Sequence, residues 1–316
     1  MVVEFIDDNF TSYNNNHGWG RMIAESLRSR PRVGKVLIVA GSGNVNWEEL
    51  NEIFPPTDKV RVLTTLSLAL TEATASQDDA IFIAPYHTED ITAAAGIAMS
   101  KAGVSVIGLG SGTSRPTFTW TTAVGASWDV SAADCLIENC LFDLTGVDAV
   151  TAGFNITAAN CHIKNCEFET ADSAGQCVLG ILTNASANGF KLENNYFKGS
   201  KHAGTSAAVR IVGGNDHKII GNTFIGAYTT TIGAVENLTT AVDRTLFKDN
   251  FIWNTTALST KATVWQATST VIFTGQNNFQ IYSGDSPITA AIGSYVGLNS
   301  YARVVASSVL IGTTSI

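Results

Sequence analysis

A six-residue segment recurs six times along the middle of the chain, and its spacing constrains the fold more than any other feature. The segments end at positions 142, 168, 197, 224, 252 and 279, so the steps between them are 26, 29, 27, 28 and 27 residues. Two apolar columns flank a bend of mostly Asn, Gly and Asp, which tolerate left-handed backbone angles at least cost. Apolar residues do not recur every 3.6 residues, so the period predicts coils of a parallel β-solenoid and not a helical repeat.

Two columns of the repeat are expected to stack inside this solenoid, because successive coils lie about 4.8 Å apart. Stacked amides would hydrogen-bond along the axis, and stacked aromatic rings would fill the bore. The predicted polar ladder comprises Cys140, Cys166, Asn195, Asn222, Asn250 and Asn277. The predicted aromatic file comprises Phe142, Phe168, Phe197, Phe224 and Phe279.

A second set of short apolar runs follows each bend by roughly a dozen residues, as expected for a coil of two or three strands. These runs lie at 154–156, 178–181, 209–212, 234–235 and 264–265. Before them the sequence predicts a short helix over 69–75, a first strand near 80–84 and the run Val-Ser-Val-Ile-Gly at 104–108.

These columns resemble those of the right-handed parallel β-helix family, the pectate-lyase-like solenoids with an internal Asn ladder. The resemblance covers about residues 80–282. It implies an all-β fold, a right-handed single-stranded parallel β-helix, here with a small α/β N-terminal cap and an apolar C-terminal cap. Similar solenoids serve as pectate lyases, glycosidases, phage tailspikes and virion surface proteins, so the fold alone does not fix the function.

Three segments are expected along the chain: a capping or anchoring segment over 1–62, the β-helix over 63–282, and a cap or subunit-contact segment over 283–316. The first segment predicts helices over 18–29 and 46–54 around a strand over 35–40. Trp47, Leu50 and Ile53 are spaced three apart and are expected to dock on the open end of the solenoid.

Two further features lie in the terminal segments. The basic cluster is expected to be a solvated loop, with an anchor on a negatively charged partner as the alternative; it comprises Arg28, Arg30, Arg32 and Lys35. The apolar residues of the last segment are expected to be mostly buried, in a cap or against another subunit; they are Ile288, Ile292, Tyr295, Val296, Val304, Val305, Val309, Leu310 and Ile311.

The net charge and the distribution of apolar residues limit the kinds of partner and the location that we expect for this protein. The 27 acidic and 19 basic residues give a net charge of −8, which argues against nucleic-acid binding. The first eight residues contain neither a basic nor an apolar region, so no secretion signal is expected. No run of about 18 apolar residues occurs, so no membrane helix is expected.

Metal and nucleotide sites are not expected. The five cysteines include Cys135-x4-Cys140 and Cys161-x4-Cys166. Zinc sites usually use Cys-x2-Cys, and the repeat period explains this spacing as two stacked core columns. The run Gly41-x-Gly43 lacks the third glycine of a dinucleotide-binding loop. No cofactor is therefore predicted.

Polysaccharide cleavage would need two carboxylates about 5–9 Å apart. Asp143 and Glu169 form an acidic pair on adjacent coils, with Glu167 beside them. These three residues are the candidates for the alternative, in which the protein is an enzyme, and no other catalytic residue is predicted. Pectate lyases, which the chain resembles, use several Asp around Ca²⁺ and an Arg base. Arg210, on a predicted strand, has no Asp cluster beside it, which counts against lyase activity.

Two further columns of the repeat, one facing outward and one facing inward, are expected to stabilise the fold. Glu138, Lys164 and Glu193 are expected to alternate in charge between coils. His217 falls in the column of Cys135, Cys161 and Phe190 and is expected to be a partly inward structural histidine.

The function predicted from these observations is a non-enzymatic virion structural protein of a tailed phage, capsid-decorating (cement) or tail-associated, assembled in the host cytoplasm. Its expected partners are other virion proteins and further copies of itself, for example in a trimer. The alternative is a protein that cleaves or binds surface glycan, with a groove lined by Trp253, Trp265 and Tyr228.

Overall fold

The structure is a computed structural model of the chain. It describes residues 23, 34–54, 56–57, 60–170, 175, 177–199, 205–228, 233–256, 261–281, 288–289, 295–296, 299–305 and 308–314.

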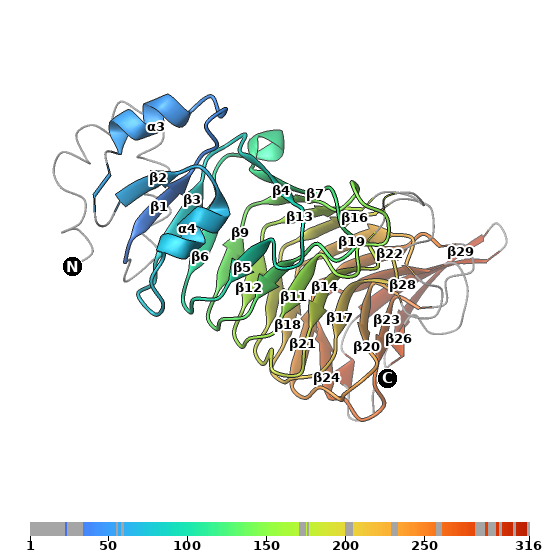
Figure 1. Cartoon of the computed structure of the whole chain (residues 1–316). Helices are drawn as coiled ribbons and strands as arrows, with labels where there is room; N and C mark the ends of the chain where they lie inside the picture. The colour runs from blue at the N-terminus through green and yellow to red at the C-terminus, as the bar shows by residue number, and fades with distance from the viewer. Residues whose placement is uncertain are drawn as a thin grey trace.

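The described chain winds into a parallel β-solenoid of three sheets, which confirms the predicted all-β parallel β-helix (Figure 1). Each coil contributes one strand to each sheet. The smallest sheet has eight strands, so the solenoid has eight coils and is about 40 Å long at 4.8 Å per coil. The right-handed winding stays a prediction.

Sheet A has eleven strands. In spatial order they are β2 (Val60–Leu63), β1 (Val36–Val39), β3 (Ala80–Ile83), β6 (Ser105–Gly108), β9 (Leu136–Glu138), β12 (His162–Lys164), β15 (Lys191–Glu193), β18 (Lys218–Ile220), β21 (Thr245–Lys248), β24 (Val271–Thr274) and β27 (Tyr295–Val296). Strands β1 and β2 therefore extend this sheet beyond the first coil.

Sheets B and C complete each coil. Sheet B runs β4 (Thr88–Ile91), β7 (Thr117–Trp120), β10 (Leu141–Asp143), β13 (Glu167–Glu169), β16 (Tyr196–Lys198), β19 (Thr223–Gly226), β22 (Phe251–Asn254), β25 (Asn278–Ile281), β28 (Asn299–Val305) and β29 (Ser308–Thr314). Sheet C runs β5 (Ile97–Met99), β8 (Trp128–Val130), β11 (Phe154–Ile156), β14 (Leu179–Thr183), β17 (Ala207–Ile211), β20 (Val235–Asn237), β23 (Thr263–Trp265) and β26 (Ile288–Thr289).

In each of the last six coils the bend from sheet A to sheet B passes through one left-handed residue. These residues are Asn139, Asn165, Asn194, Gly221, Asp249 and Gly275, with φ between 53° and 73°. At Gly221 a Cβ would lie 2.3 Å from Asn194 Oδ1, so the close stacking of the bends also favours glycine here.

The last bend differs from the sequence alignment of the repeat. Phe273, and not Thr274, pairs with Phe247 and points into the core. The bend from Thr274 to Asn277 is thus one residue longer, and Asp249 Oδ1 accepts a hydrogen bond from the extra N–H at Gln276 (2.7 Å).

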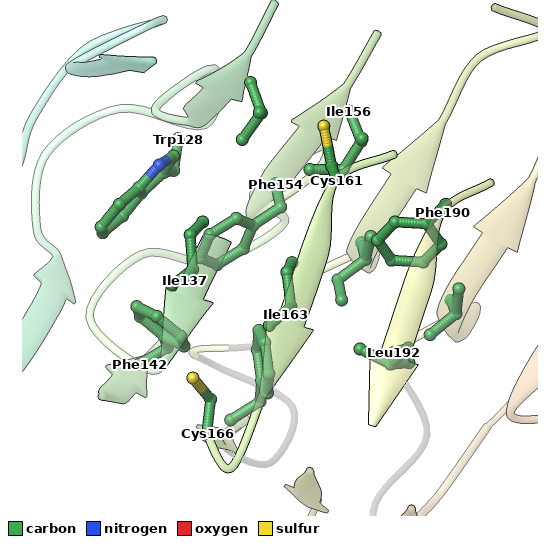
Figure 2. Packing of buried hydrophobic residues seen from close by; sticks show 14 of the residues in the cluster. Trp128, Ile137, Phe142, Phe154, Ile156, Cys161, Ile163, Cys166, Phe190 and Leu192 are labelled. Carbon is green, nitrogen blue, oxygen red and sulfur yellow. The ribbon is translucent and has the colours of Figure 1, made fainter. Parts of the chain in front are cut away.

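Apolar side chains from all three sheets fill the bore. Figure 2 shows Ile163, Phe142 and Phe154 converging from sheets A, B and C. The rings of Phe168 and Phe197 are parallel within 6° at 4.3 Å, and Phe224 lies 4.9 Å beyond Phe197. Because like side chains stack on like, each coil presents the next one with a matching surface.

The helix that closes the N-terminal end is α4 (Leu66–Glu72), which corresponds to the short helix predicted over 69–75. Leu66, Ala69 and Leu70 are buried in the main core, and Thr65 caps the helix by accepting from Leu68 N–H (3.3 Å). This cap starts α4 three residues before the predicted 69–75 helix.

Helix α3 (Trp47–Ile53) covers the outer face of sheet A instead of the open end, so that expectation was wrong (Figure 1). Its Leu50 packs with Ile38 and Phe82 in a separate cluster, with Trp47 at the margin. The outer side chains of β1, β3 and β6 are mostly apolar, so they need this cover. The side chain of Ile53 lies outside the described residues.

Some expectations fall outside the described residues. They concern most of the 18–29 helix, the arginines of the basic cluster (Arg28, Arg30 and Arg32), Ile292, and the burial of every C-terminal apolar side chain named above. Lys35 is described: its Nζ donates to Glu72 O at the end of α4 (2.6 Å). None of the described helices is long and apolar enough to cross a membrane.

Candidate functional site

The three catalytic candidates, Asp143, Glu167 and Glu169, lie on the outer face of sheet B. Each carboxylate forms a hydrogen bond or an ion pair with a neighbouring residue. Asp143 and Glu169 are in register on adjacent coils. Asp143 Oδ1 accepts from Thr145 N–H (2.9 Å) and Thr145 Oγ (2.5 Å). Glu169 Oε1 lies 3.0 Å from Lys198 Nζ.

The third candidate, Glu167, is also paired: its Oε2 lies 2.6 Å from an Arg115 guanidinium nitrogen. Both partners are largely shielded from solvent, with side chains 28% and 15% exposed. Acid–base cleavage needs one protonated carboxyl and one free carboxylate facing the same bond. With Asp143 fixed in its own turn and the two glutamates ion-paired, the arrangement favours a structural role.

The outward charges on sheet A pair differently from the expected alternation. Lys164 Nζ lies 3.1 Å from Glu138 Oε1, as stacking suggests. Glu193, however, lies beside His162, with Oε2 and Nε2 2.9 Å apart. Both His162 and Lys164 point outward from β12, so the preceding coil offers Glu193 two basic neighbours, Lys164 directly opposite and His162 on the diagonal.

A partly buried ion pair lies on sheet C, between Arg210 of β17 and Glu236 of β20. Arg210 Nε donates to Glu236 Oε1, while Glu236 Oε2 has no partner among the described residues. The Glu236 side chain is 0% exposed, and Arg210 is 32% exposed. Burial raises the pKa of Glu236, and the Arg210 guanidinium opposes that shift.

This pair lacks the partners that hydrolysis would require. The outward neighbours of Arg210 and Glu236 on the flanking coils are Leu182 and Val264. No second carboxylate thus occupies the adjacent positions of this column. Sequence reasoning noted Arg210 but missed Glu236, because a partner 26 residues away is visible only once the register of sheet C is known.

A pH-dependent contribution to stability is expected from Glu236. Its folded pKa is raised above the usual 4.5, so the folded state keeps a proton that the unfolded chain has already lost. The stability of the wild type relative to Glu236→Gln should therefore fall as pH rises above 4.5 and level off above the folded pKa. Urea unfolding across that pH range measures this difference.

A matched variant separates this effect from general destabilisation. Arg210→Gln removes the cation that opposes the shift, so its stability should fall more steeply with pH than that of the wild type. Identical pH slopes for the wild type and both variants would show that Glu236 does not titrate differently on folding.

The aromatic groove predicted for glycan binding is wrong in two of its three residues. Trp265 and Tyr228 are 2% and 3% exposed and belong to the core. Trp265 is in register with Asn237 on the inner face of sheet C. Trp253 does face solvent on sheet B, at 42% exposure, and Phe251 and Tyr196 lie half-buried on the same face.

The cysteines fill the core. All five are buried and free. Burial raises the pKa of Cys135 to about 11 and those of Cys161, Cys166 and Cys177 to about 12, so the thiols stay protonated and unreactive. No group of three or more metal-ligating side chains occurs in the described parts of the chain.

His217 lies in the inward column of Cys135, Cys161 and Phe190. Backbone hydrogen bonds from each following strand join these positions coil by coil. His217 is 0% exposed, and its Nε2 lies 3.0 Å from Gly213 O. Burial lowers its pKa, which favours the neutral ring in the core.

In the loop after β1, the N–H group that could bind a phosphate is bonded to another part of the protein. Gly41 N–H, which would face a phosphate in a nucleotide loop, donates to His87 Nδ1 (3.1 Å). His87 Nε2 lies 3.2 Å from Glu89 Oε2, and the same oxygen accepts from Leu66 N–H (2.8 Å). These bonds join the β1 loop, β4 and the start of α4 into one structural network.

Hydrogen bonds of the polar ladder join five successive coils, from Cys166 to Asn277. The backbone N–H groups of Cys166, Asn195, Asn222 and Asn250 each donate to the Asn Oδ1 of the next coil, all at 2.9 Å. Cys140 precedes Cys166 and Asn277 ends the series. The ladder is fully buried, so it binds the coils to one another and not to a ligand.

No known protein family, curated protein or solved structure matches this chain.

Proposed function

We propose that this chain is a non-enzymatic structural protein of a tailed-phage virion, placed on the capsid as a decorating protein or on the tail. The observation that carries the proposal is that the outward charges of the solenoid pair from coil to coil. The inter-coil pairs include Glu138–Lys164, Glu169–Lys198, Arg210–Glu236 and Asp216–Arg244. Such pairing consumes the carboxylates that glycan cleavage would need.

Pairing between coils also holds for the exposed pair Asp216–Arg244. Arg244 grips Asp216 through Nε (2.7 Å) and a terminal nitrogen (2.8 Å) and lowers the pKa of that carboxyl. A short rod whose middle coils are joined by ion pairs suits a component that must keep its shape on a particle surface. The virion placement itself rests on the resemblance to phage solenoid proteins, with other virion proteins and copies of the same chain as partners.

Glycan binding without cleavage is the second candidate function. The observation that favours it is the exposed Trp253, with Tyr196 and Phe251 on the same outer face of sheet B. Aromatic faces pack against the apolar faces of sugar rings, and Lys198 and Asn278 on this sheet could bond to hydroxyls.

One set of measurements tests these functions. The full chain is incubated with pectic and bacterial capsular polysaccharides, and reducing ends and unsaturated products are measured. We expect no products. Products that disappear in an Asp143→Ala/Glu169→Ala double variant would overturn the structural proposal, and glycan-array binding that Trp253→Ala abolishes would favour the second candidate.

The virion placement needs a separate test. Antibodies raised against the protein should label assembled phage particles at regular positions, and the chain should be present in purified particles in a fixed ratio to the capsid protein. Its absence from purified particles would overturn the placement.

A further inference from the structure

The sheets of a solenoid end in edges that can pair with other chains, and at the N-terminal end these edges are protected. Strand β2 carries Arg61, which pairs with Glu72 of α4 (2.9 Å). Strand β4 carries Glu89 and Asp90. Strand β5 has three residues and lies against α4. Charge, shortness and helical cover are the usual means by which edges are kept from associating.

Two of the three C-terminal edges are protected by their length. Sheet C ends in β26 and sheet A in β27, with two residues each. Sheet B ends differently, in a hairpin whose two strands have seven residues each. Figure 1 shows this hairpin at the end opposite α4.

Strand β29 is the outermost strand of sheet B. It pairs antiparallel with β28 over its whole length, from Ser308 opposite Val305 to Thr314 opposite Asn299. Within the described chain no strand pairs with its other side. At about 3.3 Å per residue it offers an edge about 23 Å long.

The sequence of this edge carries none of the usual protection. Arg303 is the last charged residue of the chain, and the strand reads Ser-Val-Leu-Ile-Gly-Thr-Thr over 308–314. It contains no proline, and nothing in it repels an identical strand. Five of the six sheet edges are thus protected and one is not.

We propose that β29 pairs antiparallel with β29 of a second copy of the chain, joining the two B sheets across a two-fold axis. Antiparallel pairing of identical strands places each donor opposite an acceptor under that symmetry, and the contact closes after two copies. Head-to-tail growth would instead need the charged N-terminal edges. This inference stands independently of the proposed function.

The contact should be of moderate affinity. A single strand pair falls short of the roughly 800 Å² per partner of a standard interface, so we expect a dissociation constant in the micromolar range. Copies held side by side on a surface would experience a higher effective concentration and pair more completely.

Sedimentation velocity of the full chain between about 1 and 200 µM, a range that spans micromolar dissociation, tests the proposal. We expect a concentration-dependent monomer–dimer equilibrium. Ile311→Lys and the milder Thr313→Lys place like charges on facing strands and should weaken the dimer at least about tenfold. The control is Ile272→Lys, which adds the same charge at a 39% exposed position of the interior strand β24 and should leave the equilibrium unchanged.

Hydrogen exchange gives a second readout that needs no variant. Amides of residues 308–314 should gain protection as the protein concentration rises, while those of the exposed bends should not. A monomer throughout the range, a trimer, or a dimer that both lysine variants leave intact would each overturn the proposal, and the last would place the contact elsewhere.

Discussion

Asn222→Ala is expected to lower the free energy of unfolding by about 3 kcal/mol or more, since each buried group left without a partner costs about 1–3 kcal/mol. Asn222 donates through Nδ2 to Leu192 O (2.9 Å) and to Asn250 Oδ1 (3.1 Å). Its Oδ1 accepts from Asn195 N–H (2.9 Å). Alanine leaves that N–H inside the solenoid and opens a cavity. Urea unfolding followed by circular dichroism measures the loss.

The matched control is Asn278→Ala. Asn278 follows the last ladder residue but is exposed on the outer face of β25. Its replacement should cost less than about 0.5 kcal/mol, as surface changes usually do. Equal losses for the two variants would show that the ladder does not hold the coils together.

Phe197→Ala is expected to cost about 3–5 kcal/mol, the usual range for removing a buried aromatic ring. Phe197 is 3% exposed and stacks between Phe168 and Phe224 at centroid distances of 4.3 and 4.9 Å. Neither neighbouring ring can move into the gap without leaving its own coil, so the cavity persists. The same unfolding experiment gives the value.

Two companions make the second prediction specific. Phe197→Leu keeps most of the volume and should cost about 1.5 kcal/mol. Trp253→Ala removes a larger aromatic from the outer face of the same sheet and should cost less than about 1 kcal/mol. If Phe197→Ala lowered the free energy of unfolding no more than Trp253→Ala does, the aromatic stack would not contribute specifically to stability.

The solenoid could be predicted from the sequence because stacking makes equivalent positions chemically alike. A buried file favours similar side chains in successive coils, as in the Phe and Asn files, and a bend favours residues such as Asn194 and Gly221 that adopt positive φ. These requirements leave columns in the sequence whatever the lengths of the connecting loops.

Features that depend on a single coil could not be predicted in this way. The extra residue before Asn277 and the pairing of Arg210 with Glu236 both depend on local register, which loops of variable length conceal. The burial of Trp265 has the same origin. Whether α3 or α4 closes the end of the solenoid also could not be predicted. Both helices have an apolar face, and only the packing in the structure shows which surface each one covers.

The coils between the two ends repeat at steps of about 27 residues, and the strands β1, β2, β28 and β29 extend their sheets at the two ends. Duplication or loss of one such coil would change the reach of the protein by a fixed step of about 4.8 Å and leave both terminal surfaces intact. Evolution could thus change the distance between the two terminal surfaces of the solenoid without changing either surface.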